Sequence, residues 1–364
     1  MRFPEFSGEW EKFRNCTLFK VISEKNKNYE FLTVLSASQT EGMVLRDSLG
    51  IDIKFEEDSI KTYKIVRNGD YVAHLRSFQG GFAFSDKTGV CSPAYTILRP
   101  SETISYGFLK PYFMSRKFID SLRIVTYGIR DGKSISVEEW LKLYTCIPKK
   151  SEQQKISKFL RLIDNRIETQ KKIIEKYESL IRGLYQFLFQ QTQYDHFVSL
   201  GDISQISNGN SDVKDASMYN DGSLYPFFDR SDEIKFLPEY LFDKEAIIYP
   251  GEGAEFYPRY YNGKFALHQR CYAVYDISTD FIPRYLYHYC KTQNSYFVRN
   301  AVGSTVASLR LDTFKRLKIP AIPTHHQESL VMFLDKIEAK IECNRTILKK
   351  YEEQKKYLLS NLFI

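Results

Sequence analysis

Residue patterns that would mark a catalytic site are missing from this chain of 364 residues. No glycine-rich run is followed by Lys-Ser or Lys-Thr, as a phosphate-binding loop requires. The Gly-Glu-Gly at 251–253 lacks the third glycine and the following helical pattern of a dinucleotide site. The Tyr-Pro-Phe-Phe at 225–228 is only superficially similar to the Asn/Asp-Pro-Pro-aromatic tetrapeptide of amino-methyltransferases. No paired-carboxylate nuclease core stands out, so we predict no catalytic residue.

Metal and disulfide chemistry are equally poorly supported by the sequence. The six cysteines show no C-x-x-C spacing, and no secretory signal precedes them. The only histidine cluster, His325-His326, stands where a helix is expected to start, which favours simple exposure. We therefore predict no metal site. No run of 18 apolar residues occurs, so we expect no contact with a membrane and a cytoplasmic location.

The charge of the chain permits binding to a polyanion but does not demand it. The formal net charge is +7, a mildly basic balance. Residues 193–323 carry 14 basic and 16 acidic side chains, so a nucleic-acid surface in that region must be a local patch. The 26 Tyr and 27 Phe favour large strand-rich cores over exposed stacking surfaces, because aromatic side chains dominate buried area.

An internal repeat defines the organisation of the chain. Residues 159–189 and 333–363 align without a gap at an offset of 174 and are identical at twelve positions. An Ile-Pro pair precedes each segment, and Gln153 matches Gln327. Further upstream, residues 129–143 resemble 304–319, with Trp140 aligned to Phe314. The chain is thus predicted to be built as domain, helix, domain, helix.

Each repeated segment is expected to be one long helix. Apolar residues recur at alternating spacings of four and three, which is the heptad pattern of a coiled coil. Each seam has one polar member at the equivalent place, which favours a role in fixing register over a tolerated residue at a wet edge. The predicted seam contains Leu160, Ile163, Ile167, Gln170, Ile174, Tyr177, Leu334, Ile337, Ile341, Asn344, Leu348 and Tyr351.

Two like units in one chain pack most simply about a pseudo-twofold axis, which makes the two helices antiparallel. The predicted fold class is α+β, with two similar domains joined by two long antiparallel coiled-coil helices. The predicted boundaries are a first head at 1–148, a first helix at 149–192, a second head at 193–323 and a second helix at 324–364.

Both heads show alternating strand patterns followed by a helical stretch. In the first head the strands are expected within 62–75 and 89–98, and the helical stretch at 107–123. In the second head the strands are expected within 245–253 and 263–276, and the helical stretch at 283–300. We expect a mixed or antiparallel central sheet in each head.

The repeated segments resemble the specificity (S) subunit of Type I restriction–modification enzymes. The resemblance is carried by IPKKSEQQKISKFLRLIDNRIETQKKIIEKYESLIRGLYQFLF and IPTHHQESLVMFLDKIEAKIECNRTILKKYEEQKKYLLSNLF. The Leu-Gly-Asp-Ile at 200–203 and GKFALHQRCYAVYD at 263–276 also fit. It covers nearly the whole chain, although the heads vary between members of the family.

The resemblance implies that each head is a target-recognition domain for one half of a split, asymmetric site in double-stranded DNA. It implies that the paired helices set the spacing and dock two methyltransferase (M) subunits, and that restriction (R) subunits join the assembly. No cofactor is expected on this chain, since S-adenosylmethionine, ATP and Mg²⁺ would act on the partner subunits. Ile173 and Ile347 lie beside the seam and are predicted to form the partner-docking surface.

Contacts to DNA require Arg, Lys, Gln, Asn or similar side chains on loops that can enter a groove. For any single candidate a solvated surface residue is as good an interpretation, and Arg270 could instead form a structural ion pair. The predicted DNA-contacting residues are Arg76, Gln79, Arg116, Arg123, Arg130, Lys133, Arg259, Lys264, His268, Gln269, Arg270 and Arg310.

Two other hypotheses stay open at this point. The chain could be a non-catalytic coiled-coil scaffold that never binds DNA, which the acidic second head would suit. It could also be an enzyme with an unrecognised site. The bases recognised cannot be deduced from the sequence, since base choice depends on loop geometry.

Overall fold

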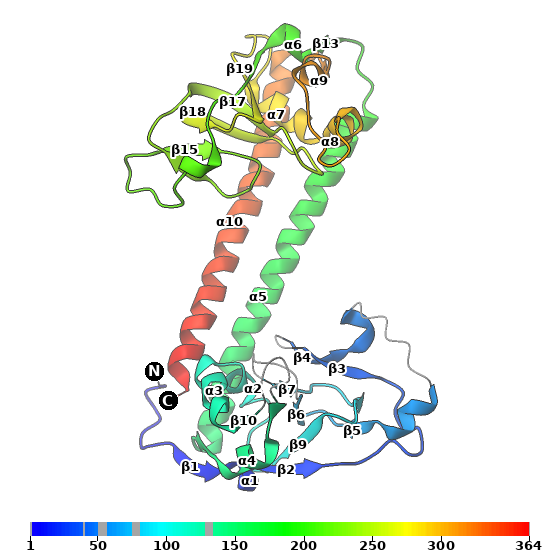
Figure 1. Cartoon of the computed structure of the whole chain (residues 1–364), viewed down its shortest axis with the longest axis vertical. Coiled ribbons are helices and arrows are strands. Elements are labelled where there is room, and N and C mark those ends of the chain that lie inside the picture. Colours follow the sequence, from blue (N-terminus) through cyan, green and yellow to red (C-terminus); the bar gives the residue numbers. More distant parts are fainter. Residues whose placement is uncertain (1, 39–40, 50–56, 75–80, 128–133, 364) are drawn as a thin grey trace. The chain divides into compact units, whose positions relative to one another are not determined.

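The computed structural model describes residues 2–38, 41–49, 57–74, 81–127 and 134–363. The described chain divides into two compact units (Figure 1). The first unit contains residues 1–170 and 347–364, and the second contains residues 171–346. Each long helix therefore contributes one segment to each unit. In the described residues, no helix is both long and apolar enough to cross a membrane.

The first unit is a mixture of short strands and short helices that precede the first long helix. Its elements are β1 (Glu11–Arg14), α1 (Asn15–Leu18), β2 (Phe19–Ile22), β3 (Leu35–Ser38), β4 (Gly42–Leu45), η1 (Arg46–Leu49), η2 (Glu57–Thr62), β5 (Lys64–Val66), β6 (Tyr71–Ala73), β7 (Phe82–Phe84), β8 (Gly89–Cys91), β9 (Thr96–Pro100), α2 (Lys110–Phe113), α3 (Arg116–Ser121), η3 (Leu122–Val125), β10 (Thr126–Tyr127), β11 (Ser134–Ile135), α4 (Val137–Lys142), β12 (Tyr144–Ile147) and the start of α5 (Lys150–Tyr185).

An antiparallel sheet of order β2-β9-β6-β7 forms the centre of the first unit. Its aromatic side chains pack against α4 through Trp140, whose ring lies 4.7 Å from the ring of Phe82 and 5.5 Å from that of Phe19. Ser136 caps α4 by accepting a hydrogen bond from the amide of Glu139, and Trp140 is the buried residue of this helix. The core is therefore largely aromatic, as the composition predicts.

The second unit has a larger sheet and longer strands. Its elements are the end of α5, η5 (Gln186–Gln191), β13 (Phe197–Ser199), α6 (Leu200–Ile203), β14 (Gln205–Asn208), η6 (Val213–Asp215), β15 (Tyr225–Phe228), β16 (Lys235–Leu237), β17 (Phe242–Pro250), β18 (Arg259–Leu267), β19 (Cys271–Tyr275), α7 (Pro283–Lys291), α8 (Asn294–Asn300), α9 (Leu311–Lys315), β20 (Lys318–Pro320) and most of α10 (Thr324–Leu362). The sheet order is β14-β19-β17-β18-β15-β16, and β15 runs parallel to β18.

The two units share a strand order. The β2-β9-β6-β7 sheet of the first unit corresponds, strand for strand in chain order, to β14-β19-β17-β18 of the second. Phe314 of α9 occupies the place of Trp140, buried against aromatic rings of its own sheet. The backbone amide of Leu200 donates to Leu317 at 2.8 Å, just as that of Asn15 donates to Leu143 at 2.8 Å. The strands and helical stretches predicted for both heads are thus confirmed.

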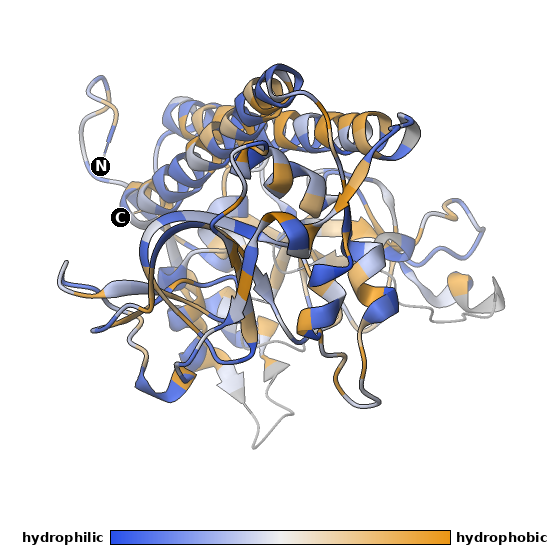
Figure 2. Ribbon diagram, turned by 90° about the horizontal axis from the view of Figure 1, so that it is seen from above, coloured by the Kyte–Doolittle hydropathy of each residue, from blue (hydrophilic) through white to orange (hydrophobic). Residues whose placement is uncertain are grey.

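The two long helices lie where the sequence predicts them, α5 over Lys150–Tyr185 and α10 over Thr324–Leu362. In the first unit Asp164 accepts from Lys355 at 2.7 Å, and in the second Glu178 accepts from Arg345 at 2.7 Å. The residue paired on α10 has a lower number as the residue on α5 has a higher one. The two helices therefore run antiparallel within each unit (Figure 1). Hydrophobic and hydrophilic residues alternate along both helices (Figure 2).

Every residue of the predicted seam is buried or half-buried. Leu160 and Ile163 share a core with Leu358, while Leu334 and Ile337 share one with Ile181. Of the two polar members, Gln170 is buried and Asn344 is half-buried. Ile173 and Ile347, predicted for partner docking, are both half-buried.

The N-terminal segment packs on α5 and on the residue that follows α10, within the first unit. The ring of Phe3 meets that of Phe159 edge-on at 5.6 Å, and the ring of Trp10 meets that of Phe363 at 6.2 Å. Arg2 forms an ion pair with Glu152 at 2.6 Å. Strand β1 then pairs with β12, in the same way that β13 pairs with β20 in the second unit.

Candidate nucleic-acid interface

The parallel pair β15 and β18 brings two turns to one edge of the sheet in the second unit. Phe227 lies opposite Ala266 and Phe228 opposite Leu267, where both strands end. Because parallel strands end at the same edge, the turns at 229–231 and 268–270 emerge side by side. The amide of His268 joins them by donating to the carbonyl of Phe228 at 2.9 Å.

The first turn is built around a buried carboxylate. Asp229 accepts hydrogen bonds from the amide and hydroxyl of Ser231, at 2.8 and 2.6 Å, and from Lys235 Nζ at 2.5 Å. Burial raises the pKa of Asp229, but these hydrogen bonds outweigh it and hold the pKa below the ordinary value. Arg259 donates to the carbonyls of Asp229 and Ser231 at 2.7 and 2.5 Å. The turn is therefore rigid, and it leaves Arg230 exposed.

Backbone contacts hold the second turn equally firmly. The amide of Gln269 donates to Ser211 at 3.0 Å, and the amide of Cys271 donates to His268 at 2.8 Å. The backbone also passes very close to Gly209, where an added Cβ would lie 1.9 Å from the carbonyl oxygen of Leu267. Only glycine fits this approach, so the turn has little freedom to move.

Gly251 makes a second close approach on the other side of this turn. A Cβ at Gly251 would lie 1.8 Å from the carbonyl oxygen of Arg270. Nη1 of Arg270 donates to both carboxylate oxygens of Glu252, at 2.9 and 3.0 Å. Arg270 is thus held by an acidic partner, as the alternative interpretation of this residue from the sequence proposes.

The two turns line a groove of about 540 Å³. Three of the predicted DNA-contacting residues come together there, namely His268, Gln269 and Arg270. The same groove is lined by Arg230, which the sequence analysis missed. The sequence pattern that could have identified Arg230 is the Asp-x-Ser turn directly after a strand. The strand at 225–228, however, is recognised only from its pairing with β18.

The other predicted residues of the second head do not line the groove. Arg259 supports the first turn from within, with its guanidinium 5.7 Å from the ring of Phe228. Lys264 lies over the ring of Tyr240 at 4.8 Å. Arg310 is exposed at the N-terminal end of α9.

In the first head, Arg76, Gln79, Arg130 and Lys133 lie outside the described residues. Arg116 and Arg123 are exposed, and both approach the carboxylate of Asp120, at 3.8 and 3.0 Å. Exposed ion pairs of this kind contribute little to stability, so both arginines can leave Asp120 for another anion.

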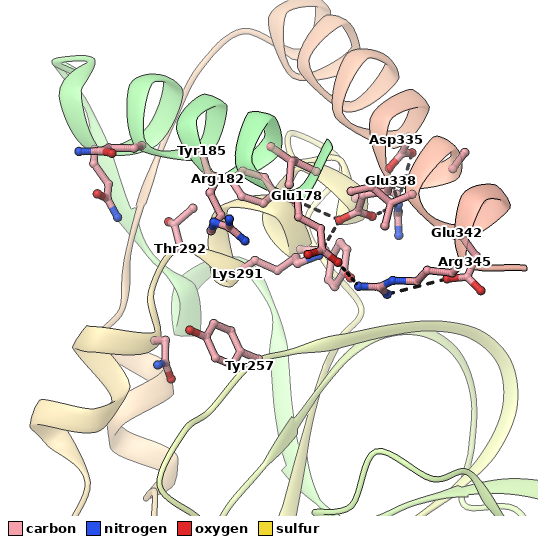
Figure 3. Close-up of a pocket in the computed structure, with 18 of the residues that line it drawn as sticks. Glu178, Arg182, Tyr185, Tyr257, Lys291, Thr292, Asp335, Glu338, Glu342 and Arg345 are labelled. Atoms are coloured by element: carbon pink, nitrogen blue, oxygen red, sulfur yellow. Dashed lines mark hydrogen bonds and ion pairs between the residues drawn. The ribbon is translucent and has the colours of Figure 1, made fainter. Parts of the chain in front are cut away.

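A larger cavity of about 1100 Å³ lies between α5, α7 and α10 within the second unit (Figure 3). Tyr185 and Asp335 line this cavity, and buried His288 contacts Asp335 at 2.8 Å through Nε2 and the Tyr185 hydroxyl at 2.9 Å through Nδ1. Tyr185 also donates to Glu338 at 3.0 Å. Burial lowers the pKa of His288, although Glu338 and Asp335 oppose that shift.

The residue types in this cluster are those of a metal site, since His288, Asp335 and Glu338 each offer a ligand atom within 4.8 Å of the others. Both carboxylates, however, already form ion pairs with basic side chains. Arg284 pairs with Asp335, and Lys291 pairs with Glu338 at 2.6 Å. A metal ion would have to displace both, so we assign the cluster to the packing of α7 against the long helices.

Comparisons with known proteins agree with this picture. Residues 195–353 match the family model of the Type I restriction modification DNA specificity domain. A solved S subunit of a Type I restriction–modification system from M. genitalium is 15% identical, with a TM-score of 0.66 over 100% of this chain and 99% of that one. A chain from a structure describing complex assembly and conformational transition of the type I R-M system is 14% identical, with a TM-score of 0.57 over 99% and 98%.

No curated protein matches the chain. Residues 195–353 thus match the family of Type I restriction modification DNA specificity domains, and over its whole length the chain has the fold of the solved S subunit. The resemblance drawn from the repeated helices is confirmed, and the groove described above lies inside the matched segment.

Proposed function

We propose that this chain is a specificity subunit, which recognises double-stranded DNA and selects the sequence on which a Type I restriction–modification complex acts. The observation that carries the proposal is the rigid pair of turns inside residues 195–353, which presents Arg230 and Gln269 to solvent at one edge of the sheet. Exposed Arg and Gln on loops are the side chains that distinguish bases in a groove of DNA.

Each head would recognise one half of a split, asymmetric site. The shared strand order of the two sheets supports two like heads, and the different amino-acid sequences of their loops support different half-sites. The two long helices would form an antiparallel coiled coil about a pseudo-twofold axis, and this coiled coil would set the spacing between the half-sites. The antiparallel contacts of α5 and α10 within each unit favour this arrangement.

The helices would also dock the partner subunits. Two methyltransferase subunits would bind near Ile173 and Ile347, and restriction subunits would join the larger assembly. S-adenosylmethionine, ATP and Mg²⁺ would act on those partners. The isolated chain is expected to show no methyl transfer, DNA cleavage or ATP hydrolysis, since its sequence carries none of the motifs for these reactions.

The test is to purify the chain with its methyltransferase partner and measure binding to duplex DNA as the salt concentration rises. We expect sequence-specific binding that weakens with salt, because binding releases counterions from the phosphates. Methylome sequencing of cells with and without the gene should then show adenine methylation at one two-part sequence. A complex that assembles but binds no DNA would instead support the non-catalytic scaffold.

A further inference from the structure

We propose that Arg230 and Gln269 are specificity-determining residues of the second head, each of which hydrogen-bonds to base edges in one half-site. This inference rests on the proposed function and adds to it the residues and the kind of contact. It begins from the groove between the turns at 229–231 and 268–270.

The charges around this groove cancel, which sets it apart from a phosphate site. Two of its acidic side chains are already paired, Asp229 with Lys235 and Glu252 with Arg270. The six charged side chains that line it are Asp212, Asp229, Glu252, Arg230, Lys235 and Arg270. A surface that binds phosphates needs a net excess of Lys and Arg, so a balanced groove suits the neutral edges of base pairs.

Two of the lining side chains remain available for a ligand. Arg230 is exposed, and across the part of the chain that the structure describes its guanidinium makes no hydrogen bond or ion pair. Gln269 is exposed, and its backbone is bonded to Ser211 and Asn208, which leaves its side-chain amide as the free group. Arginine matches the O6 and N7 atoms of guanine, and glutamine matches the N6 and N7 atoms of adenine.

Base recognition also needs a rigid support, because a mobile side chain loses entropy when it binds. Both residues have one. Arg230 follows the buried Asp229, whose bonds to Ser231 and Lys235 fix the turn. Gln269 sits in a turn that the close approaches of Gly209 and Gly251 confine. By contrast, Arg270 is committed to Glu252, so we assign it to the support of the groove rather than to the bases.

The experiment measures base discrimination by the complex of this chain with its methyltransferase partner. Once the site of the wild-type complex is known from methylome sequencing, a panel of duplexes replaces each base pair in turn, and competition binding gives the relative affinities. Arg230→Ala should lower discrimination at one or two neighbouring base pairs of one half-site by roughly 5- to 150-fold. Gln269→Ala should act within the same half-site, and the other half-site should not change.

Two further variants separate the possible roles of Arg230. Arg230→Lys keeps the charge but loses the two-pronged geometry, so it should lose the same discrimination while the salt dependence stays as in the wild type. Arg316→Ala removes an exposed arginine of the same unit, paired with Asp312 at 2.7 Å, and should leave every relative affinity unchanged.

The outcomes that overturn the inference are distinct. If Arg230→Ala weakens binding to all duplexes equally and lowers the salt slope by about one, Arg230 contacts a phosphate. If neither Arg230→Ala nor Gln269→Ala changes discrimination at any position, the groove does not contact bases. A wild-type complex that discriminates no bases at all would refute the proposed function itself, and that result is seen before any variant is made.

Discussion

Gln153 and Gln327 make the same three hydrogen bonds, each inside its own unit. The side-chain oxygen of Gln153 accepts from the amide of Ser105 at 2.8 Å. Its side-chain nitrogen donates to the carbonyls of Thr103 and Pro148, at 3.0 and 2.9 Å. Both glutamines are fully buried near the start of a long helix.

Gln327 repeats the pattern with residues that precede α7 and α10. Its oxygen accepts from the amide of Ile282 at 2.8 Å, and its nitrogen donates to the carbonyls of Asp280 and Ile322, at 2.9 and 2.8 Å. In both units one glutamine thus ties the start of a long helix to the segment that leaves the sheet. This explains why the two residues match in the alignment of the repeats.

We predict that Gln153→Leu destabilises the first unit by on the order of 3 kcal/mol, because a buried amide, a buried carbonyl and a part-buried carbonyl lose their partner. Trp10 and Trp140 are the only tryptophans of the chain and both belong to the first unit. Tryptophan fluorescence during urea unfolding therefore reports on this unit. The exposed neighbour provides the control, since Gln154→Leu should shift the midpoint little. An unchanged midpoint in Gln153→Leu would show that the three hydrogen bonds make no net contribution to the free energy of unfolding.

A second prediction concerns the pH dependence of the second unit. Burial lowers the pKa of His288, so as pH falls below about 6.5 the unfolded chain takes up a proton before the folded one does. The free energy of unfolding should therefore fall between pH 7.5 and 5.5. The pKa values of Asp335 and Glu338 are also lowered, where cation pairing outweighs burial, but their contribution is lost only at more acid pH.

The measurement is urea unfolding followed by circular dichroism at both pH values. His288→Gln should reduce the loss of stability between them, because the titrating group is gone. His326→Gln is the matched control, since His326 is exposed at the start of α10. An equal pH dependence in the wild type and in His288→Gln would assign the effect to other groups.

The sequence predicts the long helices and the order of parts well, because both depend on local patterns. The heptad spacing needs only the residues of one helix, and the repeat makes each copy evidence for the other. The alignment of Trp140 with Phe314 likewise anticipates two equivalent buried rings. These features can be predicted without knowing how distant segments of the chain pair.

The candidate interface was less predictable, since it depends on long-range pairing. Arg230 becomes notable only when β15 is placed parallel to β18, and these strands are separated by two others in the chain. The Tyr-Pro-Phe-Phe at 225–228, which looked like a faint catalytic motif, is that strand. Similarly, whether Arg270 contacts DNA or an acidic side chain depends on Glu252, which the fold brings to it.

A third prediction tests partner docking. Replacing Ile173 and Ile347 together by Asp should reduce binding of the methyltransferase subunit by roughly thirtyfold, as expected when a buried apolar contact of an interface receives a charge. Lys350→Asp changes the charge at an exposed position of α10 and should leave binding unchanged. Titration calorimetry gives the affinities, and circular dichroism checks that the variants remain folded. Full binding by the folded double variant would remove these two residues from the docking surface.

The last prediction contrasts two glycines of the second unit. Gly183 lies exposed in α5, and a Cβ added there would meet no atom within 4 Å. Gly183→Ala should therefore stabilise the unit by about 1 kcal/mol, because alanine loses less backbone entropy on entering a helix.

Gly209→Ala places the same methyl group 1.9 Å from the carbonyl oxygen of Leu267, so the turn that presents Gln269 must move. We expect a loss of stability there and weaker base discrimination in the same half-site. Urea unfolding of both variants provides the comparison. Equal effects of the two substitutions would mean that the close approach at Gly209 does not constrain the turn.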